Sequence, residues 1–164
     1  MKIVLASASP RRSQILENAG FEFTVRVSDA EEKIPKELST AEVSMFLAKK
    51  KAHAVERNSD EMIIAADTIV VLGSDILGKP KDSADAVRTL QALSGKVHTV
   101  YTGVCILYNE KEENFFDSTE VEFYSLENTD IENYVKTGEP LDKAGSYGIQ
   151  GKGALFVRKI NGDY

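Results

Sequence analysis

The stretch KIVLASASPRR, residues 2–12, joins an apolar run to a helix start and organises the predicted fold. Residues 2–6 are predicted to form a strand, and Ser9 followed by Pro10 matches the residues preferred at a helix N-cap and first helical position. Backbone N–H groups and the helix dipole at such an end attract anions. The side chains predicted to surround a phosphate or polyphosphate here are Ser7, Ser9, Arg11 and Arg12. A plain strand-to-helix turn with solvated arginines is the alternative.

The composition bounds the class of protein. A chain of 164 residues can form one domain, or two lobes sharing a sheet, with a real core. A net charge of −6 argues against general binding to nucleic acids or membrane surfaces, because that affinity comes from clustered Lys and Arg. A basic pocket in such a protein favours a small anion. The single cysteine, Cys105, lies in an apolar run and is predicted to be buried, which suits a reducing compartment. Without a signal peptide or an apolar membrane span, the expected location is the cytoplasm.

Helices and strands are predicted in mixed order. The predicted strands are residues 2–6, 21–27, 62–72, 97–107, 115–126 and 154–157, with a hairpin around 109–111. The predicted helices run from Pro10 to a cap at Gly20, from a capping box at Ser39 and Glu42, from Asp82 or Ser83 to Ser94, and from a capping box at Asn128 to Gly138. Because strands and helices do not alternate strictly, we expect a mixed sheet with helices against it.

Asp67 and Thr68 interrupt the otherwise apolar run of residues 62–72. A run of this kind is typical of a central strand covered on both faces. A carboxylate within it must be paired, bind a metal or change its pKa, since an isolated buried charge is costly. We therefore interpret Asp67 as a functional residue; an aspartate that caps a neighbouring loop is the alternative.

Basic residues occur at two further places. Successive side chains of Lys49, Lys50 and Lys51 are about 100° apart on a helix, so one of them can face a cleft while the others are solvated. Lys79 and Lys81 flank a proline in a loop, where they would neutralise phosphate charge or lie simply exposed.

Two loops carry polar groups of other kinds. The acidic cluster of Asp29, Glu31 and Glu32 is a candidate site for a divalent cation, with a solvated loop as the alternative. Residues 139–151 are rich in glycine and contain Gln150, whose amide can donate to and accept from a base edge. The alternative for this segment is a structural turn.

The sequence disfavours nucleophilic catalysis by the protein. No Ser/His/Asp set stands out, His53 and His98 form no paired metal site, and neither a Walker A loop nor a G-x-G-x-x-G fingerprint is present. Hydroxyls, cations and isolated carboxylates remain. They suit metal-assisted attack of water on phosphorus, in which cations offset developing charge and a carboxylate orients or deprotonates the water.

Several segments together resemble the Maf family of nucleoside triphosphate pyrophosphatases, in order from residue 3 to residue 164. They are SASPRR at 7–12, EE at 31–32, LAKKKA at 47–52, ADT at 66–68, GKP at 78–80, LSG at 93–95 with His98, TG at 102–103, and DKAGSYGIQG at 142–151. The last segment resembles the branch that acts on dTTP and UTP more than the branch that acts on 7-methyl-GTP.

The resemblance implies hydrolysis of a nucleoside triphosphate to the monophosphate and pyrophosphate with a divalent cation, Mg²⁺ or Mn²⁺. It implies one α/β domain over residues 1–164, in which a mixed, elongated, twisted sheet with flanking helices forms two lobes around a central cleft, as in the inosine triphosphate pyrophosphatases. The expected protein is cytoplasmic and homodimeric, with no nucleic acid or membrane partner. Similar proteins continue beyond Tyr164, so a C-terminal segment is expected to be missing from this chain.

Roles are carried over by position. Asp67 resembles the proton acceptor, Glu32 and Asp67 the carboxylates that bind metal, and Lys51 and Lys79 the lysines that face the phosphates. Base preference is implied for Arg12, Thr68 and Gln150. The remaining predicted phosphate contacts are Ser7, Ser9, Arg11 and Lys81. A nucleotide-binding regulator of cell division, active in septum formation without significant turnover, is the competing interpretation.

Overall fold

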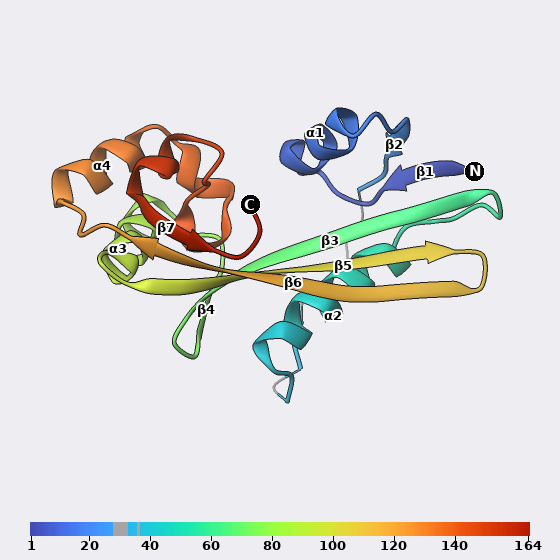
Figure 1. Cartoon of the computed structure of the whole chain (residues 1–164), viewed down its shortest axis with the longest axis horizontal. Coiled ribbons are helices and arrows are strands. Elements are labelled where there is room, and N and C mark those ends of the chain that lie inside the picture. Colours follow the sequence, from blue (N-terminus) through green and yellow to red (C-terminus); the bar gives the residue numbers. More distant parts are fainter. Residues whose placement is uncertain (28–32, 36) are drawn as a thin grey trace. The chain divides into compact units, whose positions relative to one another are not determined.

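The structure, a computed structural model, describes residues 1–27, 33–35 and 37–164. These residues form a mixed sheet of seven strands in the order β2-β1-β3-β5-β6-β7, with β4 beside β3 (Figure 1). The strands are β1 (Lys2–Leu5), β2 (Phe23–Val25), β3 (Glu61–Leu72), β4 (Asp75–Leu77), β5 (Val97–Tyr108), β6 (Lys111–Phe123) and β7 (Val157–Asn161). Strand β1 is parallel to β2 and β3, whereas β4 is antiparallel to β3 and β7 to β6. The predicted mixed α/β class is confirmed.

The helices follow the predicted order. They are α1 (Pro10–Asn18), α2 (Thr40–His53), α3 (Ser83–Leu93) and α4 (Asn128–Lys136), with the 3₁₀ turns η1 (Glu139–Asp142), η2 (Ala144–Ser146) and η3 (Lys152–Phe156). The chain divides into two compact units. The first comprises Met1–Asp67 and Thr102–Phe116, and the second comprises Thr68–Tyr101 and Asp117–Tyr164.

The first unit has its own core beneath α2. Its buried residues are Val4, Ala6, Ala48, Ala52, Val55, Ile63, Ala65, Cys105 and Leu107. Cys105 is fully buried, as predicted, and burial raises the pKa of its thiol to about 11. Helix α2 begins with the predicted capping box, in which Ser39 and Glu42 each accept a backbone N–H of the other. The box therefore defines where α2 starts.

Glycine is required at position 103, where β5 passes beneath α2. A Cβ atom placed there would lie 2.3 Å from the carbonyl carbon and oxygen of Ser44. Ser44 is completely buried, and its hydroxyl donates to the carbonyl of Ala41 at 2.8 Å. Without a side chain at Gly103 the helix can approach the strand closely, which fixes the height of α2 over the sheet.

The start of α1 differs in one respect from the prediction. Ser9 is the N-cap residue, but its side chain makes no capping hydrogen bond; its backbone N–H donates instead to Ser7 Oγ at 3.2 Å. The helix ends as expected, because the N–H groups of Gly20 and Phe21 donate to carbonyls of the last turn.

The second unit is built around α3 and α4, which pack against each other. Its buried core residues are Ala86, Leu90, Leu93, Val121, Phe123, Ile131, Tyr134, Val135, Tyr147 and Phe156. Asp82 caps α3 by accepting the N–H of Asp85 at 2.7 Å. This outcome agrees with one of the two predicted caps.

Two local predictions in the second unit are wrong. The predicted capping box at Asn128 is absent: the N-cap of α4 is Glu127, without a side-chain cap, and the Asn128 amide oxygen accepts a hydrogen bond from Gln91 at 2.9 Å. The predicted strand at 154–157 is mostly the 3₁₀ turn η3, and β7 begins only at Val157. The strand predicted at 115–126 is confirmed as β6, with shifted bounds: it begins at Lys111, at the end of the predicted hairpin turn, and ends at Phe123.

Candidate active site

In the first unit, the loop between β1 and α1 is tied to β3 by Arg12. Its Nη1 donates to the carbonyl oxygen of Ala66 at 2.6 Å and to Ser7 Oγ at 3.1 Å. Ser7 is 8% exposed and accepts the Ser9 N–H at the same oxygen. Because Ser7 Oγ accepts two bonds, its own proton is left to donate. The predicted serine and arginine pair therefore lies beside the residue that precedes Asp67.

The charge of Arg12 is held in a partly desolvated place. Burial lowers the pKa of Arg12 below its ordinary value, the negative charge of Asp67 opposes that fall, and the positive charge of Arg11 adds to it. An anion bound to this arginine would compensate for part of the hydration that the guanidinium loses on burial.

Asp67 is the buried carboxylate that the pattern of β3 predicts. The residue is 8% exposed, and Lys51 Nζ forms an ion pair with its Oδ1. Lys51 comes from the last turns of α2, so the close approach at Gly103 helps to set where its side chain begins. An ammonium group in an ion pair with a carboxylate favours the ionised form of that carboxylate, and the ionised form can accept a proton. This carboxylate and the lysine form the chemical centre of the first unit.

The second unit contains the other predicted residues. Thr68 is partly buried in β3, and Lys79 and Lys81 have exposed side chains in the loop before α3. Gln150 is exposed in the turn before η3. The N–H of Gly145 donates to the carbonyl of Gly78 at 3.1 Å, so the loop of Lys79 and the segment of Gln150 are joined. That these four residues form one substrate site together with Arg12 and Asp67 stays a prediction.

A buried histidine anchors the glycine-rich segment. His98 on β5 is 2% exposed, and its Nε2 lies 2.7 Å from the hydroxyl of Tyr147. Burial lowers the pKa of His98 to about 4, so the ring is neutral near neutral pH. The prediction of a structural histidine agrees with this environment.

Of the two carboxylates predicted to bind a metal, Asp67 is the one that lies among the described residues. The described residues contain no group of three or more His, Cys, Asp or Glu side chains that could hold an ion. Glu32 and the rest of the acidic cluster lie outside the described residues. The oxygen of Asp67 is of the type that Mg²⁺ prefers, and Mg²⁺ is commonly held by one or two carboxylates together with substrate phosphates. The residue type therefore fits a divalent cation.

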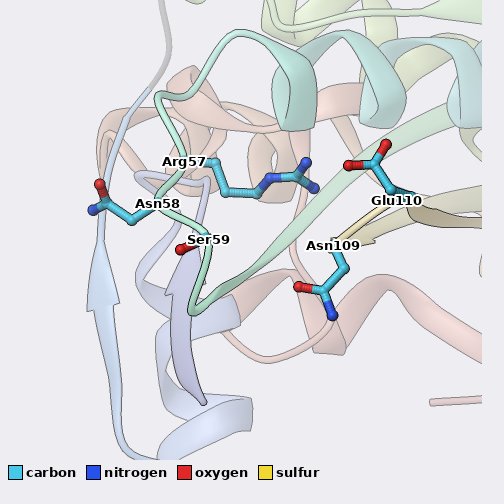
Figure 2. A pocket seen from close by; sticks show the side chains of 5 residues that line it. All are labelled: Arg57, Asn58, Ser59, Asn109 and Glu110. Carbon is cyan, nitrogen blue, oxygen red and sulfur yellow. The ribbon is translucent and has the colours of Figure 1, made fainter.

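Two pockets of the first unit are lined by residues outside the predicted site. One, of about 430 Å³, is lined by Arg26, Glu56, Arg57 and Asn58. The other, of about 300 Å³, is lined by residues of two turns, Arg57, Asn58, Ser59, Asn109 and Glu110 (Figure 2). In Figure 2 the Arg57 side chain extends toward the side of the pocket formed by Glu110. Neither lining includes a predicted site residue that the structure describes.

The protein-family model described as "Maf-like protein" matches residues 2–164 of the chain. The chain belongs to this family. No helix of this Maf chain, within the described residues, is long and apolar enough to cross a membrane.

Curated relatives of this Maf chain carry a specific name. The chain is 51% identical over 164 residues to a protein of Bacillus pumilus named dTTP/UTP pyrophosphatase, and the match covers 99% of this chain and 87% of the relative. It is 54% identical to a protein of the same name in Bacillus cereus, covering 99% and 86%.

Solved structures share the fold of the Maf chain at low identity. The Staphylococcus aureus Ham1 protein has a TM-score of 0.53 at 16% identity, covering 75% of this chain and 72% of that one. A HAM1 protein from Coxiella burnetii has a TM-score of 0.50 at 18% identity, covering 95% and 91%. These likenesses establish the fold alone.

Sequence reasoning missed one residue with many contacts. Glu139, in the glycine-rich segment, accepts hydrogen bonds from Tyr134, Lys152 and Gly153. An acidic residue directly before a proline gives no local signal of this role, because its partners come from α4 and from η3.

Proposed function

We propose that this Maf chain hydrolyses dTTP and UTP to the nucleoside monophosphate and pyrophosphate. The observation that carries the proposal is the buried Asp67, paired with Lys51 and adjacent to the carbonyl that Arg12 contacts. A buried carboxylate among cations suits a proton acceptor in a reaction of an anionic substrate. The name shared by two relatives at 51% and 54% identity supports the choice of substrate.

The proposed reaction is attack of water on the α-phosphorus. The water gives its proton to the Asp67 carboxylate, the new bond joins its oxygen to phosphorus, and the bond to the oxygen that bridges the α and β phosphates breaks. Pyrophosphate leaves with that bridging oxygen. Lys51 keeps Asp67 ionised before the reaction and offsets phosphate charge.

A divalent cation, Mg²⁺ or Mn²⁺, belongs to the proposal. When bound it would neutralise charge on the phosphate oxygens and polarise the reacting phosphorus. The residues proposed to hold it are Asp67 and Glu32.

The remaining residues are assigned to binding. Those proposed to contact phosphates are Ser7, Ser9, Arg11, Lys51, Lys79 and Lys81, and those proposed to contact the base are Arg12, Thr68 and Gln150. Hydroxyls and guanidiniums suit phosphate oxygens, whereas an amide can pair with a pyrimidine edge. One domain over residues 1–164, a homodimeric state and a location in the cytoplasm are part of the proposal and rest on the resemblance.

The test is the Asp67→Asn variant. Asparagine keeps the size of the side chain and cannot accept the proton of water as a carboxylate does. We expect pyrophosphate release from dTTP and UTP to fall by at least about 100-fold, since general base catalysis contributes roughly 10²–10⁴. Nucleotide binding, measured by calorimetry, should persist. Asp75→Asn changes an exposed carboxylate on β4 and should keep full activity.

The products distinguish the proposal from other reactions. In water labelled with heavy oxygen, the label should enter the monophosphate, and pyrophosphate should appear before orthophosphate. Orthophosphate as the first product would mean attack at the γ-phosphorus. Unchanged turnover in Asp67→Asn would remove the assigned base, and tight nucleotide binding without turnover in the wild type would favour a regulatory protein.

A further inference from the structure

The turn that carries Gln150 begins and ends with glycine. The N–H of Gly151 donates to the carbonyl of Gly148 at 3.2 Å, which places Ile149 and Gln150 at the central positions of a four-residue turn. Gln150 is exposed at this turn. What holds the two ends of the turn therefore sets where the Gln150 amide lies.

The end at Gly151 lies against the carboxylate of Glu139. A Cβ atom on Gly151 would lie 2.3 Å from Glu139 Oε1, so no other residue fits without displacing that carboxylate. Glu139 Oε2 accepts the N–H of Lys152 at 3.1 Å, and Oε1 accepts the N–H of Gly153 at 3.4 Å. The carboxylate thus holds the backbone directly after the turn.

The end at Gly148 lies against Lys143. A Cβ atom on Gly148 would lie 2.8 Å from Lys143 Cε. The side chain of Lys143 is 12% exposed, and its Nζ donates to the carbonyl oxygen of Glu139 at 2.6 Å and to Asp142 Oδ1 at 2.7 Å. Both ends of the turn are therefore packed against side chains that are linked through Glu139.

Glu139 is itself held in place by α4. The hydroxyl of Tyr134, a residue only 5% exposed, donates to Glu139 Oε1 at 3.0 Å. Partial burial raises the pKa of Glu139, but the hydrogen bonds from Lys152, Tyr134 and Gly153 outweigh it and lower the pKa overall. The carboxylate is ionised near neutral pH and acts as an acceptor for all its donors.

We propose that Glu139 is a positioning residue for base discrimination: it holds the turn of residues 148–151 so that the Gln150 amide faces the pyrimidine edge. This inference rests on the proposed function, in which Gln150 contacts the base. Uracil presents a carbonyl where cytosine presents an amino group, so the two are told apart by whether a donor or an acceptor stands opposite. A displaced amide would lose this distinction.

The first test compares Glu139→Gln with Glu132→Gln. Both variants remove one negative charge, but Glu132 is an exposed residue of α4. A glutamine at 139 must turn its NH₂ group toward one of the groups that donate to the Glu139 carboxylate, and the hydrogen bond from that donor is lost. We expect the ratio of kcat/KM for UTP to that for CTP to fall about 10-fold in Glu139→Gln, because small misplacements reduce rates by up to roughly 100-fold. Glu132→Gln should keep the wild-type ratio.

The second test asks whether Glu139 acts through Gln150. The double variant Glu139→Gln/Gln150→Ala should discriminate between UTP and CTP no worse than Gln150→Ala alone. Effects that multiply in the double variant would show that the two residues act independently and would overturn the inference.

The third test needs no turnover. Hydrogen exchange at the amides of Lys152 and Gly153 should accelerate in Glu139→Gln and stay at the wild-type rate in Glu132→Gln. Gly151→Ala, which pushes against the same carboxylate, should produce the same acceleration, and in the kinetic assay of the first test it should produce the same loss of discrimination. It carries the test should Glu139→Gln not fold.

The outcomes separate the two proposals. A wild-type chain that prefers UTP, with the same preference in a folded Glu139→Gln or Gly151→Ala, overturns the positioning role alone. A wild-type chain without pyrophosphate release overturns the proposed function. The inference then depends on the exchange rates and on the ratio of UTP to CTP binding, and unchanged values of both overturn it.

Discussion

Three consecutive lysines of α2 have three different partners. Lys49 forms an ion pair with Glu112 at 2.6 Å, Lys50 lies over the ring of Phe46 at 5.5 Å, and Lys51 pairs with Asp67. Steps of about 100° between successive side chains send them in different directions. Lys51 is thus distinguished from its neighbours by a carboxylate in β3 and not by its own type.

Arg12 is a residue whose geometry matters beyond its charge. In Arg12→Lys the charge stays, but one ammonium on a shorter chain replaces the planar group that contacts both Ala66 O and Ser7 Oγ. We expect the free energy of unfolding to fall by about 1.5–3 kcal/mol, the range of a hydrogen bond that involves a charged group, and KM for dTTP to rise.

Urea denaturation and steady-state kinetics measure these two effects. Arg57→Lys, at an exposed position of the first unit, is the control and should change neither. A fully stable Arg12→Lys variant would mean that the contacts with Ala66 and Ser7 contribute little.

At the scale of elements, the packing of α2 on β5 decides where Lys51 begins. Gly103 and the buried Ser44 allow the helix and strand to touch. The stripe of Ala48 and Ala52 continues this close contact toward the end of the helix. Small residues along the contact let the helix lie low over the sheet, and Lys51 can then reach the carboxylate of β3.

Gly103→Ala should loosen this contact. The new methyl group would lie 2.3 Å from backbone atoms of Ser44, so α2 must shift. We expect destabilisation of about 1–3 kcal/mol, typical of overpacked interiors, together with a lower rate of pyrophosphate release because Lys51 moves with the helix.

Gly78→Ala is the matched control for stability, since a Cβ atom there has no heavy atom within 4 Å. Urea denaturation of both variants checks the prediction. Equal stability of Gly103→Ala and the wild type would show that α2 adjusts without cost.

At the scale of the whole molecule, each unit contains a buried titratable group that folding keeps unprotonated. In the first unit the Arg26 side chain donates two hydrogen bonds to Glu61, and chiefly these lower the pKa of Glu61 from 4.5 to about 2. In the second unit burial lowers the pKa of His98 from 6.5 to about 4. In both cases the unfolded chain binds more protons than the folded chain.

Stability should therefore fall as the pH falls. The contribution of His98 is present above pH 6.5 and is lost as the pH falls toward 4. The contribution of Glu61 is present above pH 4.5 and is lost toward pH 2. Tm measured against pH should decline through both windows.

Two variants assign the windows. His98→Gln should flatten the decline between pH 6.5 and 4, and Glu61→Gln should flatten the decline between pH 4.5 and 2. A slope between pH 6.5 and 4 that persists in His98→Gln would contradict the role of the buried imidazole.

The sequence by itself determined the elements whose signals are local. The helix starts at Ser9 and Ser39, the buried strand around Asp67 and the buried Cys105 all follow from residues within a few positions of one another. Caps, turns and apolar periodicity act over one or two helical turns, so they can be read without knowing the fold.

Tertiary structure alone decided the contacts that make a site. Arg12 reaches the carbonyl of a residue 54 positions away, and Lys51 reaches a carboxylate 16 positions away. The 3₁₀ turn at Lys152–Phe156 replaces a predicted strand where Glu139 accepts the N–H groups of its first residues. Such partners are brought together by the packing of whole elements, and composition, spacing and periodicity carry no record of that packing.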